Sequence, residues 1–381
     1  MRFFELVSAF LPNLCRTRSL PAFFCLMIPS SFRFFPCPRT AAATAIVFLV
    51  TPVSSITMFG HDGDHGPHSS DEEKVPAPVL QEGQMAVTGH GAFTFEAVAG
   101  FGEFPEGEKL GPTHGGVAVD AEGLIYVSTN GDKSIAVFRE NGEYLRSFGP
   151  ELRGLHSLQI VEEGGQQFLY GAQLSPPQKG ASPRAVKLDL EGNVVGEISE
   201  TSTGGIPGGF KGLTSVAVAP DGSVFLATGY GANRIHKFTA TGERVATFGE
   251  KGEGEKMFRT CHGLAIDLRF GEPRLLVCDR EKRRLLHFDL GGNWIGEHAT
   301  GLRRPCAVSF HGDFCAVAEL AARVVILDKA GHEVAVLGDN PNQEQWANYK
   351  VAPKDQKLGI FTAPHGLSFD TWGNLYVQDW N

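Results

Sequence analysis

A repeated pattern of short apolar stretches constrains the fold of this chain more than any other feature. One unit recurs from about residue 84. It consists of two apolar stretches joined by a turn, a polar link, and two further stretches joined by a glycine turn. The clearest copy runs from Leu213 to Gly249, and the fourth stretch often ends in Phe-Gly, as it does there. Such a run of short strands and tight turns predicts a four-stranded antiparallel meander for each copy.

Six copies of this unit align along the chain. Spacing of roughly 40 to 60 residues, with four strands in each unit, is typical of β-propellers. Pairs such as Asp221-Gly222 and Gly373-Asn374 supply the positive φ that tight hairpin turns need. We therefore predict an all-β, six-bladed β-propeller over residues 84–381. Its innermost strands are expected to begin near Val117, Leu158, Val216, Leu264, Val308 and Leu367.

Closure of the ring needs strands from both ends of the repeat region. The last copy stops after a second strand over 375–379, which by itself would leave an exposed sheet edge. Residues 84–87 and 93–102 have the pattern of third and fourth strands without a first and second. We predict that these N-terminal strands complete the sixth blade, two strands from each end.

Residues 1–57 are predicted to be a signal for export. Arg33 and Arg39 precede an apolar run over 41–50, and small residues follow, which is the order of a secretory signal. That run is shorter than the about 20 apolar residues that span a bilayer. We expect a secreted or periplasmic protein with no stable membrane insertion beyond a signal anchor. Translation from Met27, an uncleaved signal and a cytoplasmic protein remain alternatives.

Residues 58–83 are predicted to form a flexible, histidine-rich linker. His61, His65 and His68 stand among polar, glycine and proline residues, with no apolar face to bury. Loose binding of a divalent metal by these histidines remains an alternative.

Charge and cysteine content narrow the classes of partner. The net charge is −9 and the basic residues are scattered, so no positive stripe for nucleic acid is expected. Pairing among the cysteines of the repeat region cannot be read from their spacing. These cysteines are Cys261, Cys278, Cys306 and Cys315.

One face of the predicted ring carries a candidate metal site. In a meander blade, the link into the first strand and the link after the second open on the same face, around the central channel. Just before the first strand, the six copies carry Gly115, His156, Thr214, His262, Cys306 and His365, and His114 lies one residue out of register. The three aligned histidines fall on alternate blades, which are about 120° apart in a sixfold ring.

Three neutral imidazoles around an open fourth position are the ligand set of catalytic zinc. We therefore predict that His156, His262 and His365 bind a metal, with zinc as the expected ion. Iron and copper also accept imidazole ligands. Whether a calcium ion also occupies the channel is left open.

The links after the second strands supply candidate catalytic residues. Tyr230 would act as a general base, because a nearby cation favours the phenolate. Arg280 offers a guanidinium for a substrate carboxylate. An aromatic lining and an ordinary surface ion pair remain alternatives for these two residues.

Residues Val224 to Phe238, Cys261-His-Gly-Leu and Cys278-Asp-Arg-Glu resemble the catalytic core of peptidyl-α-hydroxyglycine α-amidating lyase. That family is a six-bladed propeller of the NHL-repeat type. The resemblance implies that Tyr230 is the catalytic tyrosine, that Arg280 is an active-site arginine, and that the zinc ligands are His156, His262 and His365. It also implies a peptide or small amide substrate, whose carbinolamide C–N bond is cleaved to give an amide and glyoxylate.

Two positions depart from the family pattern, Gly231 beside the tyrosine and Ala363 before the last histidine. A second active-site arginine has no clear counterpart, so another hydroxylated amide remains open as the substrate. A non-catalytic NHL propeller that binds a peptide or protein on its channel face is the alternative function. A lactone or ester hydrolase is a third class, but such sites use carboxylate ligands for calcium, and this face is rich in histidine.

Overall fold

The computed structural model describes residues 86–102, 104–105, 108 and 110–380. The chain divides into units of residues 1–40 and 41–381, and every described residue lies in the second. The predicted export signal and linker lie outside the described residues and remain predictions. Among the residues that the structure describes, no helix is long and apolar enough to cross a membrane.

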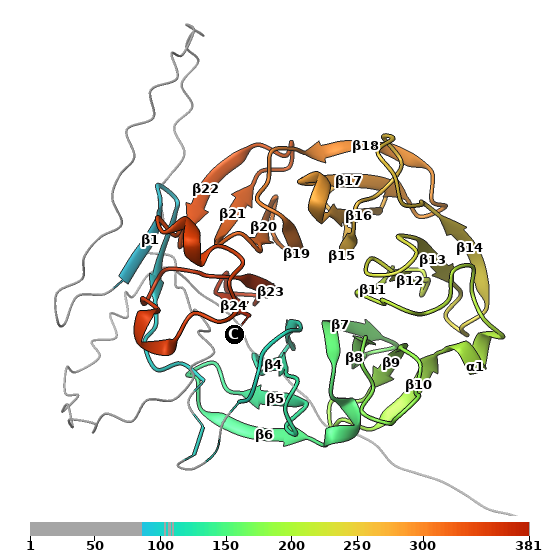
Figure 1. Ribbon diagram of the computed structural model, residues 1–381, viewed down its shortest axis with the longest axis horizontal. Helices are drawn as coiled ribbons and strands as arrows, with labels where there is room; N and C mark the ends of the chain where they lie inside the picture. Colours follow the sequence, from blue (N-terminus) through green and yellow to red (C-terminus); the bar gives the residue numbers. More distant parts are fainter. Residues whose placement is uncertain (1–85, 103, 106–107, 109, 381) are drawn as a thin grey trace, which may run out of the picture. The chain divides into compact units, whose positions relative to one another are not determined.

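Five four-stranded antiparallel sheets follow one another along the chain (Figure 1). Blade 1 contains β3 (Val117–Val119), β4 (Ile125–Ser128), β5 (Ile135–Phe138) and β6 (Tyr144–Phe148). Blade 2 contains β7 (Leu155–Glu163), β8 (Gln166–Gln173), β9 (Arg184–Leu188) and β10 (Val194–Ile198). Blade 3 contains β11 (Ser215–Val218), β12 (Val224–Ala227), β13 (Ile235–Phe238) and β14 (Arg244–Phe248).

Blade 4 contains β15 (Cys261–Asp267), β16 (Arg274–Asp279), β17 (Arg284–Asp289) and β18 (Trp294–Ala299). Blade 5 contains β19 (Pro305–His311), β20 (Phe314–Glu319), β21 (Arg323–Leu327) and β22 (Glu333–Leu337). Helical segments are short and lie in the links: η1 (Pro150–Leu152), α1 (Glu200–Thr203), η2 (Arg280–Lys282), η3 (Gln343–Gln345) and η4 (Pro353–Asp355).

The sixth position of the ring is built from both ends of the described chain. β23 (Pro364–Phe369) pairs with β24 (Leu375–Asp379), and β1 (Ala86–His90) pairs with β2 (Phe93–Ala97). The two hairpins share one hydrophobic core with blade 5. They form two separate two-stranded sheets, and within the described residues no backbone ladder joins β24 to β1 or β2. The N-terminal hairpin is instead held by side-chain packing against β22.

The innermost strands close the ring. Each of β3, β7, β11, β15 and β19 contacts the innermost strand of the next blade, and β23 contacts β3. All six predicted first strands fall within these elements. The fold is therefore an all-β, six-bladed propeller, as the repeat predicted.

Apolar cores between neighbouring blades hold the ring together. The core between blades 1 and 2, for example, joins Tyr126 and Phe148 to Leu155 and Val186. Full burial of each such side chain stabilises the fold by about 1.5–3 kcal/mol. Because these cores lie between blades, the axis is left with a channel of about 270 Å³ lined by the innermost strands.

Aspartates shape the turns that connect strands within the blades. In each, one carboxylate oxygen accepts the backbone N–H groups two and four residues later, which fixes the turn. Glycines at the equivalent turns have positive φ, including the predicted Gly373 (91°) and Gly222 (80°), whose turn begins at Ala219 instead of an aspartate. The aspartates of this kind are Asp120, Asp189, Asp289, Asp328 and Asp370.

Candidate metal centre

The structure brings together the three histidines of the alternate blades. His156, His262 and His365 are each the second residue of an innermost strand, β7, β15 and β23, and each is 2 % exposed. Their ring centroids are 4.7 to 4.8 Å apart in every pair. Three imidazoles from blades 2, 4 and 6 therefore meet at the channel axis, whereas their role as metal ligands remains a prediction.

Backbone carbonyls of the following blades fix the orientation of all three rings. Each Nδ1 donates to the carbonyl of the equivalent residue one blade further round: His156 to Thr214 (2.7 Å), His262 to Cys306 (2.9 Å) and His365 to Gly115 (2.9 Å). Because a carbonyl oxygen only accepts, Nδ1 carries the proton and Nε2 keeps its lone pair. This is the arrangement in which metal-binding histidines are usually held.

Glycines after two of the histidines allow this close approach between blades. A Cβ at Gly263 would lie 2.2 Å from the carbonyl oxygen of Cys306, and one at Gly366 would lie 2.7 Å from that of Gly115. These are the two carbonyls that accept from His262 and His365. Glycine follows His262 and His365 because a larger residue would collide with the backbone of the neighbouring strand.

Burial keeps the three imidazoles neutral. Their pKa values are lowered well below the ordinary value, chiefly because burial penalises the charged form. The positive charge of Arg280 lowers all three further. Neutral imidazole is the form that binds metal ions.

Tyr230 and Arg280 lie beside the histidines, as the blade alignment predicted. The Tyr230 hydroxyl lies 2.9 Å from Nε2 of His262 and 3.3 Å from Nε2 of His156. Arg280, the first residue of η2, donates from Nη1 to the same hydroxyl at 2.9 Å and from Nε to Glu281. Burial raises the pKa of Tyr230 to about 12, against the opposing charge of Arg280. A lowered pKa beside a metal ion therefore remains a prediction.

The pattern of lone pairs and protons suits a bound cation. Tyr230 has a single hydroxyl proton, which can satisfy Nε2 of His156 or of His262 but not both. Nε2 of His365 is buried and has no hydrogen-bond partner among the described residues. Three imidazole lone pairs thus share one proton, and nitrogen donors of this kind suit zinc and neighbouring divalent ions.

Two further residues at the centre were not predicted as ligands. One ligand atom each of His262, Cys306 and His365 lies within 4.8 Å of the others, and the same holds for His114, His156 and His365. Cys306 occupies the same aligned position as the histidines, so the repeat could have identified it. His114 lies one residue out of that register, so the alignment of the copies does not select it.

The four cysteines of the propeller are free and buried, so the described part of the chain contains no disulfide. Burial raises the pKa of the Cys306 thiol to about 11, although Arg280 opposes the shift. Cys306 is therefore a protonated thiol at neutral pH when no metal is bound, and it would lose this proton on binding a metal.

A side pocket of about 200 Å³ opens next to the histidines. It is lined by His114, Asn130, Arg153, Gly154, His156, Leu174 and Ser175. Arg153 directly follows η1 and pairs at 3.3 Å with the largely exposed Asp132. Its own side chain is 39 % exposed, so the guanidinium is accessible to a ligand. No sequence pattern pointed to Arg153, because it comes from the link between blades 1 and 2.

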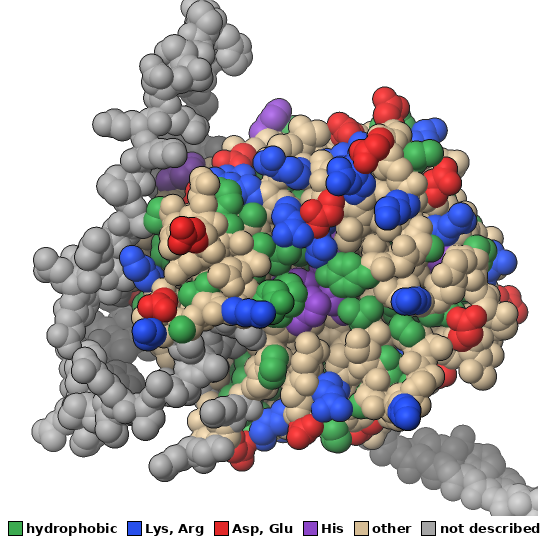
Figure 2. Space-filling model, in the orientation of Figure 1, with side chains coloured by type: hydrophobic (Ala, Val, Ile, Leu, Met, Phe, Trp, Pro, Cys, Tyr) green, Lys and Arg blue, Asp and Glu red, His purple; other side chains and the backbone are tan. Residues whose placement is uncertain are grey.

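The face around the site combines histidine, apolar and basic side chains (Figure 2). Histidine lies at the middle of this face, with hydrophobic side chains beside it. The ring of Tyr349 stacks on Trp380 at 4.3 Å, and Trp380 stacks on His114 at 4.0 Å. This row of rings lies beside the site, because the ring centroid of Trp380 is also 6.1 Å from that of His365.

A second histidine cluster lies in blade 4, away from the three-histidine centre. Ligand atoms of Asp267, His287 and His298 lie within 4.8 Å of one another. Arg269 fills this cluster, because it donates to both carboxylate oxygens of Asp267 and contacts Nε2 of His298 at 3.3 Å. The guanidinium already supplies the positive charge, so this cluster is an ion-pair network and not a metal site.

Comparisons with known proteins identify no family for this chain. No family model matches the chain, and no curated protein matches it. Solved structures that resemble it include a streptogramin B lyase, at 14 % identity over 71 % of this chain and 95 % of the other, with a TM-score of 0.46. Virginiamycin B lyase from Staphylococcus aureus matches at 12 % identity over 72 % and 97 %, with a TM-score of 0.46.

A nidogen–laminin complex matches at 15 % identity over 66 % of this chain and 83 % of the other, with a TM-score of 0.47. At such low identities and scores, these likenesses carry no information about the site residues.

Proposed function

We propose that the protein is a zinc-dependent carbon–nitrogen lyase that cleaves a peptidyl-α-hydroxyglycine-like carbinolamide into an amide and glyoxylate. The supporting observation is the Tyr230 hydroxyl, which lies within hydrogen-bond distance of Arg280 and of Nε2 of His262, beside two further imidazoles. These residues are also the ones to which the family resemblance assigns the chemistry.

The reaction needs one proton to move between two atoms of the substrate. The carbinol O–H bond and the C–N bond break, while a C=O bond and an N–H bond form. A single group that takes the hydroxyl proton and returns it to the departing amide nitrogen balances the reaction. Tyr230 is suited to this shuttle, because its phenolate accepts a proton and its phenol donates one.

A bound zinc ion and Arg280 would together oppose the burial that raises the pKa of Tyr230. Zinc bound by His156, His262 and His365 would supply a Lewis acid and a positive charge next to Tyr230. Arg280 donates to the Tyr230 oxygen and so stabilises negative charge there. Glu281 accepts from Nε of Arg280 at 2.9 Å, which fixes the direction of the guanidinium.

The side pocket suits the carboxylate end of the substrate. Arg153, Asn130 and Ser175 line this pocket together with His114 and His156, and a guanidinium pairs well with a carboxylate. Arg153 thus takes the place of the second arginine that the sequence lacked. The row of rings that ends in Trp380 offers an apolar wall for the peptide part of the substrate.

The proposal is tested with the purified full chain, zinc and a benzoyl-α-hydroxyglycine substrate. We expect amide and glyoxylate in equal amounts, formed faster than in a protein-free blank, and loss of this activity with a zinc chelator. The matched control is a substrate with α-methoxyglycine, which has no hydroxyl proton to remove and should not react. No product above the blank would contradict the proposal and favour the peptide-binding alternative.

A further inference from the structure

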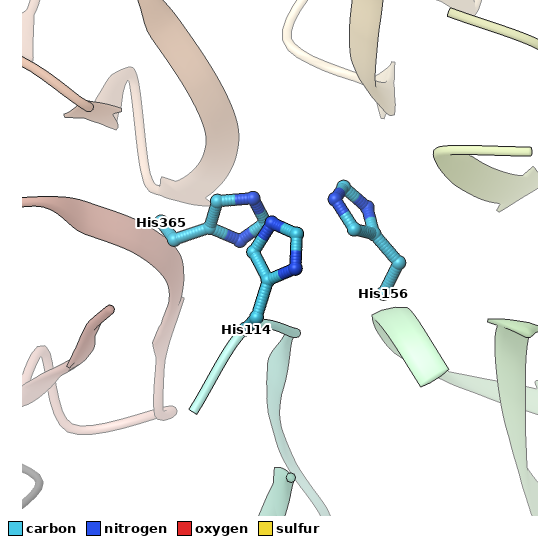
Figure 3. Close-up of side chains that lie close together, drawn as sticks. All are labelled: His114, His156 and His365. Atoms are coloured by element: carbon cyan, nitrogen blue, oxygen red, sulfur yellow. The ribbon is translucent and has the colours of Figure 1, made fainter. Parts of the chain in front are cut away.

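His114 brings a fourth imidazole to the three-histidine centre. It lies in the link that enters β3, next to Gly115, whose carbonyl accepts from His365. Its ring centroid is 4.7 Å from that of His156 and 4.6 Å from that of His365. Figure 3 shows the rings of His114, His156 and His365 turned toward one common space.

The ring of His114 is held in this position by the indole ring of Trp380. It stacks on Trp380 with an interplanar angle of 18° and a centroid distance of 4.0 Å. The backbone N–H of Trp380 donates to the carbonyl of Ala363, two residues before His365. A rotation of the His114 side chain away from the centre would therefore lose its stacking on Trp380.

Two imidazole nitrogens at the three-histidine centre have no hydrogen-bond partner among the described residues. Nε2 of His114 and Nε2 of His365 are both buried, and neither has a hydrogen-bond partner among the described residues. A buried polar atom without a partner costs about 1–3 kcal/mol. Since one ligand atom each of His114, His156 and His365 also lies within 4.8 Å of the others, these unpartnered nitrogens indicate a missing ligand. A histidine kept only for packing would be expected to satisfy its ring nitrogens within the protein.

We propose that His114 is a fourth nitrogen ligand of the metal centre, so that the site is a four-imidazole site and not a three-imidazole one. The inference rests on the metal-dependent function proposed above and changes its ligand set. Four neutral nitrogen donors favour copper, nickel, cobalt and zinc over calcium and magnesium. His114 also competes with a substrate oxygen for the position that three histidines leave open.

The test measures metal binding by spectroscopy, without reference to turnover. The metal-stripped full chain is titrated with Co²⁺, followed by visible absorption, and with Cu²⁺, followed by electron paramagnetic resonance of the coordinated nitrogens. His114→Phe keeps an aromatic ring against Trp380, and His114→Gln is a second variant that keeps a polar side chain. The matched control is His332→Ala, because His332 has a 78 % exposed side chain and bonds only Asp328.

We expect the His114 variants to bind Co²⁺ at least about tenfold more weakly and to show one coordinated nitrogen fewer with Cu²⁺. The control should bind both ions as the parent does. Equal Co²⁺ affinity and an equal nitrogen count in the parent and in both His114 variants would overturn the inference.

The outcomes separate this inference from the proposed function. Four coordinated nitrogens without glyoxylate production would support the inference and contradict the function. Glyoxylate production with unchanged metal binding in the His114 variants would support the proposed function and contradict the inference. A parent chain that binds neither ion would overturn both.

Discussion

The hydroxyl of Tyr230 lies 2.9 Å from Nε2 of His262, although the two residues come from different blades. Tyr230 follows β12 in blade 3, and His262 enters blade 4 through β15. The same hydroxyl accepts a hydrogen bond from Arg280, so a potential proton carrier lies between a fixed cation and a candidate metal ligand. This relationship makes the proposed chemistry testable residue by residue.

Tyr230→Phe removes the hydroxyl and keeps the ring. We expect kcat for the hydroxyglycine substrate to fall by about 10²- to 10⁴-fold, the usual contribution of a general acid or base. Zinc content, measured by elemental analysis, should not change, because Tyr230 is not among the proposed ligands. Tyr144→Phe, which removes a hydroxyl from β6, the outermost strand of blade 1, is the control and should keep full activity. An active Tyr230→Phe enzyme would rule out the proton shuttle.

Arg153→Ala tests the side pocket. We expect KM for a substrate with a free carboxylate to rise about tenfold, in line with the loss of a hydrogen bond to a charged group, while kcat changes little. The methyl ester of the substrate should react equally with the parent and the variant. Arg139→Ala is the control, because Arg139 is half-exposed and its ion pair, with Glu143 at 3.4 Å, lies away from the site on the last turn of blade 1. An unchanged KM would place the carboxylate elsewhere.

Gly263→Ala tests the close contact between blades 4 and 5. The added Cβ would lie 2.2 Å from the carbonyl oxygen of Cys306 and would push away the acceptor of His262. We expect the free energy of unfolding in urea to fall by about 1–3 kcal/mol, together with weaker metal binding. Gly296→Ala is the matched control, because no atom of the described residues lies within 4 Å of a Cβ at this strand glycine. Equal stability of the two variants would show that the contact is unimportant.

Asp379→Asn tests the carboxylate that holds the link before His365. Asp379 is fully buried and accepts from the backbone N–H groups of Thr362 (2.8 Å) and Ala363 (2.5 Å). Burial raises its pKa from 3.8 to about 6, so the folded state binds more protons than the unfolded state in that interval. Its contribution to stability therefore decreases as the pH rises from about 4 to about 6.

Asparagine does not titrate, so the difference in unfolding free energy between the parent and Asp379→Asn should change with pH. Relative to the variant, the parent should lose roughly 2–3 kcal/mol between pH 4 and pH 6. Urea denaturation at several pH values measures this difference, and contributions from the buried histidines cancel in it. Parallel stability curves for the two proteins would contradict the assignment.

The repeat predicted the propeller because each blade is built from local signals. Strand patterning and turns such as Asp221-Gly222 act over a few residues, and their recurrence indicated six blades and their first strands. It also indicated the use of N-terminal strands to close the ring. That these strands form their own sheet, packed on β22 without a backbone ladder to β24, depends on side-chain packing between distant segments.

The alignment of blades was also enough to select His156, His262 and His365, because equivalent positions in a ring must face the same axis. It did not select His114 or Arg153, which reach the site from irregular links.

The sequence by itself thus determined the period, the channel face and the three aligned histidines, since these follow from short-range patterns and rotational symmetry. Only the tertiary structure decided which nitrogen of each ring is free. Hydrogen bonds such as that from His365 to Gly115, 250 residues apart, form only once the ring has closed.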